Sequence, residues 1–272
     1  MEKKKYQNKD WLEKQYEILC YTSEISKTYG INYDTLEYWR KKFNIEKKKK
    51  NNANKKYSFD ENFFETIDTE EKAYWLGFIM ADGCITSNIK NGPPNRLEIN
   101  LKDSDESHLK KFITSIKGTQ KVLIRKIHDK RGFYTQRATV RINSVKISRD
   151  LIKLGVVQNK TGKEFIPNID DRLLWHFVRG FFDGDGSITK TKNTTFKICS
   201  SSEKIINQLS QFFKKNNIHI GIQKYTNYTN PFFIIETNKK KSIKQIFEKM
   251  YSQSKIYLER KYEKFLSIGP DL

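Results

Sequence analysis

From residue 57 onward, the apolar residues follow two alternating periodicities. Strands are indicated where apolar side chains occupy every second position, as in Arg96–Lys102, where three apolar residues alternate with four polar ones. Helices are indicated by longer apolar segments, above all at residues 74–82 and 175–185. The pattern predicts an α+β fold in which helices alternate with pairs of strands.

The same order of predicted elements occurs twice. After the first long apolar helix come strands at 96–102, 121–127 and 133–143 and helices at 104–117 and 145–154. After the second come strands at 187–190, 194–199, 220–226 and 232–236 and helices at 202–215 and 242–251. We therefore predict two tandem αββαββα repeats, at 57–165 and 166–272, that form a monomer with internal pseudo-two-fold symmetry.

The two long apolar helices carry small residues at the same spacing. Gly77 lies four positions before Ala81, and Gly180 lies four positions before Gly184. Residues four apart share one face of a helix, so each helix presents a surface without bulky side chains. Such surfaces let two helices pack with their backbones close together. We expect these helices to form the interface between the repeats.

Each of these helices ends in an acidic residue, Asp82 or Asp185, although the C-terminal end of a helix favours cations. Packed in parallel, the helices would bring the two carboxylates together, and like charges at that distance require a cation between them. Hard oxygen ligands suit Mg²⁺ or a similar divalent ion. Gly83 and Gly186 are then expected to end the helices in a left-handed conformation.

Residues 75–83 and 178–186 resemble the LAGLIDADG motif of the homing endonucleases. The resemblance implies a DNA endonuclease in which Asp82 and Asp185 bind Mg²⁺ or Mn²⁺, with Ala81 and Gly184 in the same metal site. The family motif has an earlier acid, which is Asp183 in the second copy and Met80 in the first. That position is not a metal ligand in the family, so Met80 does not argue against catalysis.

The resemblance also assigns lysines to the active site. Lys160 and Lys261 occupy the position, after the last helix of each repeat, where the family carries a lysine near the scissile phosphate. Lys102 is a further candidate catalytic residue in the first repeat. By rough register its counterpart in the second repeat is Cys199, which predicts that the two halves of the active site are unequal.

Residues 1–48 are predicted to form a separate helical domain. Three short helices are indicated between residues 10 and 45, with Asp10 and Ser23 as N-caps of the first two and Gly30 in the turn before the third. The residues expected to be buried are Ile25, Tyr29, Ile31, Leu36 and Trp39. The segment resembles a helix-turn-helix domain, and a trihelical packing module without a DNA contact is the alternative.

The helix-turn-helix resemblance implies a DNA contact by the third helix. Asn32, Tyr33, Thr35 and Arg40 would be exposed on this helix and would meet the major groove. A lysine-rich segment without apolar periodicity, residues 49–56, is expected to be a linker to the first repeat.

Charge favours a nucleic-acid partner. The 272 residues carry 52 Lys and Arg against 32 Asp and Glu, a formal net charge of +20. An AT-biased coding sequence would also enrich lysine, so the motifs have to decide between a nucleic-acid partner and a bias in composition. The basic residues expected on the polar face of the two sheets, which would receive duplex DNA, are Arg96, Lys102, Arg125, Arg137, Arg141, Lys190, Lys197 and Lys224.

Other classes of protein are disfavoured. The three cysteines are isolated, which suggests neither a disulfide framework nor a zinc site, and the four histidines share no metal-ligand spacing. No run of about 18 apolar residues occurs, so no membrane association is predicted. We expect an intracellular protein of the cytoplasm, the nucleoid or an organelle matrix, and not a secreted one.

Three functions remain after these observations. The first is a site-specific endonuclease that cleaves double-stranded DNA. The second is a maturase that binds intron RNA with the same fold, as some members of the family do. The third is a helix-turn-helix transcriptional regulator with an inactive nuclease domain, and the presence of both Asp82 and Asp185 weighs against it.

Overall fold

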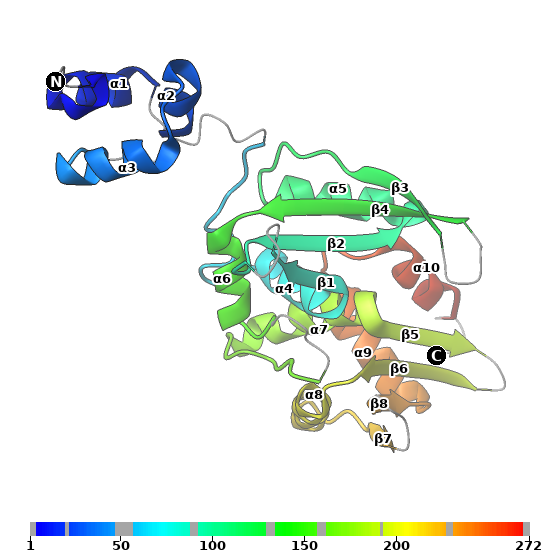
Figure 1. Ribbon diagram of the computed structural model, residues 1–272. Helices are drawn as coiled ribbons and strands as arrows, with labels where there is room; N and C mark the ends of the chain where they lie inside the picture. The colour runs from blue at the N-terminus through cyan, green and yellow to red at the C-terminus, as the bar shows by residue number, and fades with distance from the viewer. Residues whose placement is uncertain are drawn as a thin grey trace. The chain divides into compact units, whose positions relative to one another are not determined.

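The computed structural model describes residues 4–19, 22–46, 57–87, 92–128, 134–156, 162–190, 193–226 and 231–268 (Figure 1). The chain divides into two compact units, Met1–Lys56 and Tyr57–Leu272. The predicted linker at 49–56 lies outside the described residues. No helix in the part of the chain that the structure describes is long and apolar enough to cross a lipid bilayer.

The first unit is a three-helix module with its own small core. Its elements are η1 (Lys5–Gln7), α1 (Lys9–Leu19), α2 (Thr22–Tyr29) and α3 (Tyr33–Lys42). Leu12, Tyr16, Ile25, Leu36 and Ile45 are buried together at the centre. Gly30 lies between α2 and α3 with a φ of +62°, a conformation that favours glycine and makes the tight turn of a helix-turn-helix.

Some local predictions for this unit were wrong. Asp10 lies inside α1, and the side chain of Asn8 accepts the hydrogen bond from Trp11 N (3.0 Å) in its place. Ser23 likewise lies inside α2, which begins at Thr22. Tyr29 is 43% exposed, because its ring packs edge-on against Trp11 at the border of the small core.

The second unit contains the two predicted αββαββα repeats. Repeat 1 comprises α4 (Glu70–Asp82), β1 (Gly83–Thr86), β2 (Arg96–Lys102), η3 (Asp103–Asp105), α5 (Glu106–Ser115), β3 (Leu123–His128), β4 (Tyr134–Asn143) and α6 (Val145–Lys153). Repeat 2 comprises α7 (Asp171–Asp185), β5 (Gly186–Lys190), β6 (Thr194–Ser200), α8 (Glu203–Lys215), β7 (Gly221–Tyr225), β8 (Phe232–Thr237), α9 (Lys240–Tyr251) and a further helix, α10 (Glu259–Ile268). The predicted fold class is confirmed.

Each repeat forms one antiparallel sheet with the same strand order, β1-β2-β4-β3 in repeat 1 and β5-β6-β8-β7 in repeat 2. One face of each sheet is covered by helices and contributes to a continuous apolar core. Helices α4 and α7 pack side by side between the two sheets (Figure 1). The two motif helices therefore form the interface between the repeats, as the sequence predicted.

The close approach of α4 and α7 requires glycine at two positions. A Cβ atom on Gly77 would lie 2.1 Å from Phe177 O, and one on Gly180 would lie 2.0 Å from Tyr74 O. Both distances are far below van der Waals contact with backbone atoms, which cannot move aside. The helices thus pack backbone to backbone, and the prediction from the spacing of small residues is confirmed.

The prediction of left-handed glycine caps was wrong. Gly83 and Gly186 have φ of −81° and −87° and extended backbone, because the chain passes directly from helix into strand. Space explains glycine at these positions instead. A Cβ atom on Gly83 would lie 2.6 Å from Ile79 O, and one on Gly186 would lie 2.1 Å from Phe182 Cδ2.

Candidate active site

The two motif acids lie at the neighbouring ends of α4 and α7. Asp82 is the last residue of α4, and Asp185 is the last residue of α7. A Cβ atom on Gly184 would lie 2.4 Å from the Cβ of Ala81 and 3.3 Å from Asp82 Oδ2, so the Asp82 carboxylate lies against the last turn of α7. The packing of the helices brings all four residues of the predicted metal site together.

Lys261 lies beside the two acids. It belongs to α10, is 8% exposed, and donates a hydrogen bond to the backbone oxygen of Gly186. Burial lowers the pKa of Lys261 to about 8, while the negative charges of Asp183, Asp82 and Asp185 act in the opposite direction. A buried ammonium next to two carboxylates could stabilise charge on a phosphate or exchange a proton with water.

The other predicted lysines are placed differently. Lys160 lies outside the described residues. Lys102 is exposed at the end of β2, where it is the cross-strand partner of Arg137. The structure therefore places one of the three candidate catalytic lysines, Lys261, next to the acids.

The strand register corrects the expected counterpart of Lys102. Gly83 pairs with Ile99, and Gly186 pairs with Ile198, so the residues that follow, Asn100 and Cys199, are equivalent. The predicted equivalence of Lys102 and Cys199 was wrong by two residues. The prediction aligned the two strands roughly from the sequence, whereas the hydrogen-bonded register decides which residues correspond.

Asn100 and Cys199 give the two halves of the site different chemistry. Asn100 accepts a hydrogen bond from the hydroxyl of Thr139 (2.7 Å). Cys199 instead pairs across the sheet with the apolar Ile234, and burial together with the charge of Asp185 raises the pKa of its thiol. Repeat 1 thus has a hydrogen-bonded amide at this position, and repeat 2 has a thiol opposite an apolar side chain.

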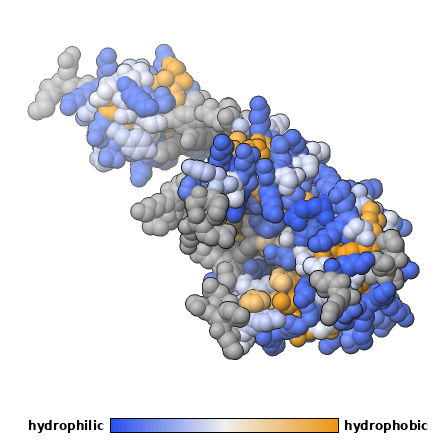
Figure 2. Space-filling view, turned by 90° about the vertical axis from the view of Figure 1, so that its right-hand side faces the viewer, coloured by the Kyte–Doolittle hydropathy of each residue, from blue (hydrophilic) through white to orange (hydrophobic). Residues whose placement is uncertain are grey.

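The outer face of the first sheet, which is the face without helices, is strongly basic. Lys102, Arg137 and Arg125 are neighbours across β2, β4 and β3 and therefore project from the same face. Arg141 forms an ion pair with Glu98 on this face, and the side chain of Arg96 donates to Asn143. Figure 2 shows that hydrophilic residues predominate on the visible side of the second unit, with smaller hydrophobic patches between them.

In the second sheet, the structure contradicts the predicted shared face. Lys197 lies on the outer face and pairs with Glu236 (2.8 Å). Lys224 pairs across the sheet with the buried Phe233 and forms an ion pair with Glu203 at the start of α8, so it lies on the helix-covered face. Lys190 pairs with Thr194 and lies on the same helix-covered face of the sheet as Ile188. The alternation of the sequence already contained this signal, since Lys190 follows Ile188 by two residues and Lys224 follows Ile222 by two.

The predicted DNA-contacting residues of the first unit are only partly available. Asn32 caps α3 by accepting hydrogen bonds from the backbone of Asp34 and Thr35, and Tyr33 is 45% exposed. Arg40 was predicted to be exposed, but its side chain is only 15% exposed. It donates to Ile45 O (2.7 Å) at the end of the domain and is bound to Glu37, which withdraws it from the surface.

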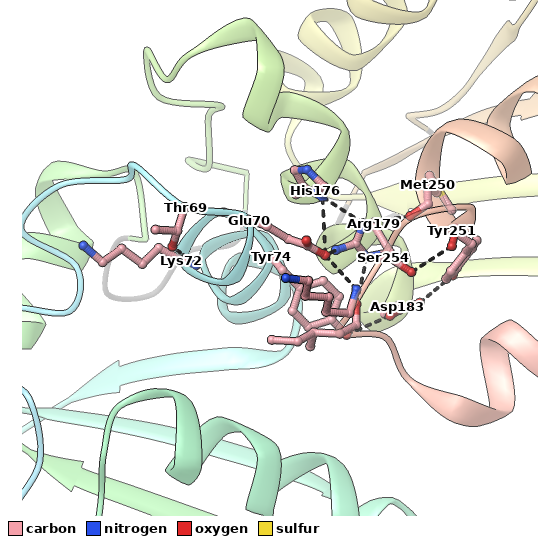
Figure 3. A network of polar contacts seen from close by, with 12 residues as sticks. Thr69, Glu70, Lys72, Tyr74, His176, Arg179, Asp183, Met250, Tyr251 and Ser254 are labelled. Carbon is pink, nitrogen blue, oxygen red and sulfur yellow. Dashed lines mark hydrogen bonds and ion pairs between the residues drawn. The ribbon is translucent and has the colours of Figure 1, made fainter.

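A buried polar network inside the helix pair was not predicted (Figure 3). Asp183 is fully buried and accepts hydrogen bonds from Tyr74 Oη (2.7 Å), Tyr251 Oη (2.8 Å) and Leu258 N (2.8 Å). Burial raises the pKa of Asp183 to about 6, against the effect of these three donors. Arg179 is also fully buried. The sequence did contain a signal for this network, because Arg179 and Asp183 place a charged residue in each of two turns of an otherwise apolar helix.

The donor set is compatible with a divalent metal that is shared with a substrate. Among the described residues, no group of three or more His, Cys, Asp or Glu could hold a metal by itself. Mg²⁺ typically keeps several waters and binds through one or two carboxylates together with substrate phosphate oxygens. Asp82 and Asp185 supply such a pair of carboxylates, and Ala81 and Gly184 lie beside them.

Family models match three segments of the chain. A LAGLIDADG-like domain matches residues 173–251, the LAGLIDADG-like domain of WhiA matches residues 71–149, and a MerR helix-turn-helix family regulatory protein matches residues 21–72. The first two matches fall on repeat 2 and repeat 1. The resemblance that the motifs suggested is confirmed.

Solved structures with the same fold include two homing endonucleases. I-WcaI bound to its DNA recognition sequence matches with 13% identity and a TM-score of 0.54, covering 74% of this chain and 90% of that chain. I-DmoI in complex with DNA and Ca matches with 14% identity and a TM-score of 0.51, covering 73% and 97%. At these identities the likeness shows the fold. A search of the curated proteins found no match.

Proposed function

This chain carries two LAGLIDADG-like domains after a helix-turn-helix unit, and on that premise we propose that it is a site-specific endonuclease. It would hydrolyse both strands of double-stranded DNA as a monomer, with Mg²⁺ or Mn²⁺ as cofactor. The similar fold of an endonuclease solved with DNA and Ca supports the use of a divalent metal.

The observation that carries this proposal is the convergence of Asp82 and Asp185 at the end of the α4–α7 pair. These two carboxylates would hold the divalent metal ions, which supply an activated water and neutralise charge on the phosphate. Lys261 would donate to the scissile phosphate from its buried position. The basic outer face of the first sheet would bind the DNA backbone beside this site.

Cleavage of a randomised duplex DNA library tests the proposal. We expect the wild-type protein to select and cut one family of long sequences in the presence of Mg²⁺ or Mn²⁺, and to bind them uncut in the presence of a chelator. Asp82→Asn and Asp185→Asn should each abolish double-strand cleavage and leave binding largely intact, because they remove metal ligands and not the basic face. Full cleavage by either variant would refute the metal assignment.

A transcriptional regulator is the second candidate, because residues 21–72 match a helix-turn-helix family of regulatory proteins. The proposed roles differ in the fate of the bound DNA. A regulator would bind a defined site and leave it intact with every divalent metal, and deletion of residues 1–48 would abolish that binding. Selective binding of intron RNA without DNA cleavage would instead support a maturase.

A further inference from the structure

The segment just before α10, residues 255–258, is held by side chains from both repeats. Each of its four residues has one backbone group in a hydrogen bond with a side chain of α4, α5 or α7. The four bonds join Lys255 N to Glu70 Oε1 (2.9 Å), Ile256 O to Arg179 Nε (2.9 Å), Tyr257 O to Lys111 Nζ (3.2 Å) and Leu258 N to Asp183 Oδ2 (2.8 Å). We call residues 255–258 the clamped segment.

The clamped segment fixes the start of the helix that carries Lys261. Leu258 O accepts the backbone hydrogen bonds of Lys261 (3.0 Å) and Tyr262 (3.1 Å), while Leu258 N is bound to Asp183. The beginning of α10 is also tied to repeat 1, because Arg260 binds Asp105 (2.8 Å). A shift of Leu258 would therefore shift Lys261.

Asp183 is the part of this arrangement that helix packing alone does not require. At the equivalent position of repeat 1, two residues before the motif acid, Met80 fills the core with an apolar side chain. A buried carboxylate is costly unless its oxygens are hydrogen-bonded, and Asp183 accepts three bonds, one of them from the clamped segment. The acid is thus used to hold a backbone, through its bond to Leu258 N.

We propose that Asp183 is a positioning residue that sets Lys261 against Asp82 and Asp185 through its hydrogen bond to Leu258. The proposal rests on the proposed nuclease function for its catalytic consequence, but the placement of Lys261 can be tested without it. A structural role alone would lower stability and slow the cleavage of both DNA strands together. A positioning role affects the strand that Lys261 serves.

Strand-specific cleavage of a supercoiled plasmid that carries the selected site tests the catalytic consequence. We expect Asp183→Asn to slow one strand by about tenfold to a hundredfold, so that nicked plasmid accumulates, as expected for a small displacement of a catalytic group. Lys261→Ala should slow the same strand, and the double variant should be no slower than Lys261→Ala alone. The matched control is Met80→Leu, which changes the same position of repeat 1 and should leave both strands unaffected.

Reductive methylation of Lys261, followed by mass spectrometry, tests the placement independently of nuclease activity. Lys261 is 8% exposed, so its amine should react slowly in the wild-type protein and several-fold faster in Asp183→Asn, while the exposed lysines should react at an unchanged rate. Tyr251→Phe removes one donor to Asp183 and keeps the ring, so it provides a milder variant if Asp183→Asn does not fold.

The outcomes separate the two proposals. If Lys261 is methylated faster in Asp183→Asn than in the wild-type protein, but the wild-type protein has no nuclease activity, the proposed function is contradicted and the positioning stands. Unchanged methylation in both variants would overturn the positioning. So would equal slowing of both strands in Asp183→Asn, or additive effects of Asp183→Asn and Lys261→Ala on the same strand.

Discussion

The two sheets have the same strand order, but their outer faces differ in charge. Within the paired strands, the face of repeat 1 carries five basic side chains and the acid Glu98, a net charge of +4. The face of repeat 2 carries one basic residue, Lys197, and one acid, Glu236, and is neutral. The two repeats therefore share a strand order while the charge of their outer faces differs.

One pair of positions shows this difference in detail. Glu98 on β2 is bound to Arg141 on β4 in repeat 1. The equivalent positions of repeat 2 hold the same ion pair with its charges exchanged, Lys197 on β6 and Glu236 on β8. Either order satisfies the sheet, so the position requires opposite charges and no particular sign.

The comparison bears on how DNA would be bound. Lys102, Arg125 and Arg137 form a row of neighbouring cations in repeat 1, suited to phosphates and guanine edges. On the outer face of repeat 2, Tyr225 and Phe232 stack with ring centroids 4.6 Å apart. We expect repeat 1 to supply most of the electrostatic attraction, and repeat 2 to contribute chiefly uncharged contacts.

The largest effect is expected where the repeats are alike. Gly77→Ala and Gly180→Ala would each place a Cβ atom about 2 Å from a backbone oxygen, so α4 and α7 would have to separate. Each should lower the free energy of unfolding by about 3 kcal/mol or more in urea titrations. Gly221→Ala is the control, because its nearest neighbour, Glu236 O, would be 3.7 Å away. A large effect of only one motif variant would break the symmetry of the interface.

The salt dependence of DNA binding sharpens the difference in charge. Each phosphate contact contributes about 0.9 to the slope of log K against log salt concentration, so changing Lys102, Arg125 and Arg137 to Gln together should reduce that slope by about 2 to 3. Changing Lys197 and Glu236 together to Gln should leave it nearly unchanged, because their pair is neutral. Equal reductions, measured by fluorescence anisotropy, would contradict the assignment to repeat 1.

A pH effect is expected where a buried path joins the repeats, from Asp183 through Tyr74 to His108. Burial lowers the pKa of His108 to about 3, so between about pH 3 and 6.5 the unfolded chain binds a proton that the folded chain does not, and stability falls as pH decreases. For Asp183 the folded pKa is raised to about 6, which stabilises the folded state in acid and partly offsets this loss.

The variant His108→Gln separates these opposing effects. In the wild type, His108 should lower the free energy of unfolding by about 2 kcal/mol between pH 7 and pH 5. The variant lacks this effect and should therefore lose less stability in acid. Urea unfolding at the two pH values measures this difference. An identical pH dependence of both proteins would mean that His108 does not determine it.

The smallest effect is expected from exchanging the ion pair of repeat 1. Glu98→Lys would place two positive charges opposite each other and lower stability by roughly 0.2–1 kcal/mol. Adding Arg141→Glu would reproduce the order of Lys197 and Glu236 and should restore most of that loss. A double variant less stable than Glu98→Lys would show that the sign of each position is fixed by its surroundings after all.

The sequence alone determined the architecture and the location of the acids. Alternation of period two indicated the strands, and the apolar helices with small residues four apart indicated the interface of α4 and α7. These features were predictable because they depend on neighbours within one helix or strand. The faces of Lys190 and Lys224 were also determined by alternation, and the prediction overlooked it.

The tertiary structure alone decided which distant groups meet. Asp183 receives Tyr74 from 109 residues away and Leu258 from 75 residues away, and no local pattern contains either contact. Strand register likewise made Asn100, and not Lys102, the counterpart of Cys199. The face on which a side chain lies follows from its own strand or helix. Its contact partners follow from how segments far apart in the sequence pack together, and this packing involves both repeats at once.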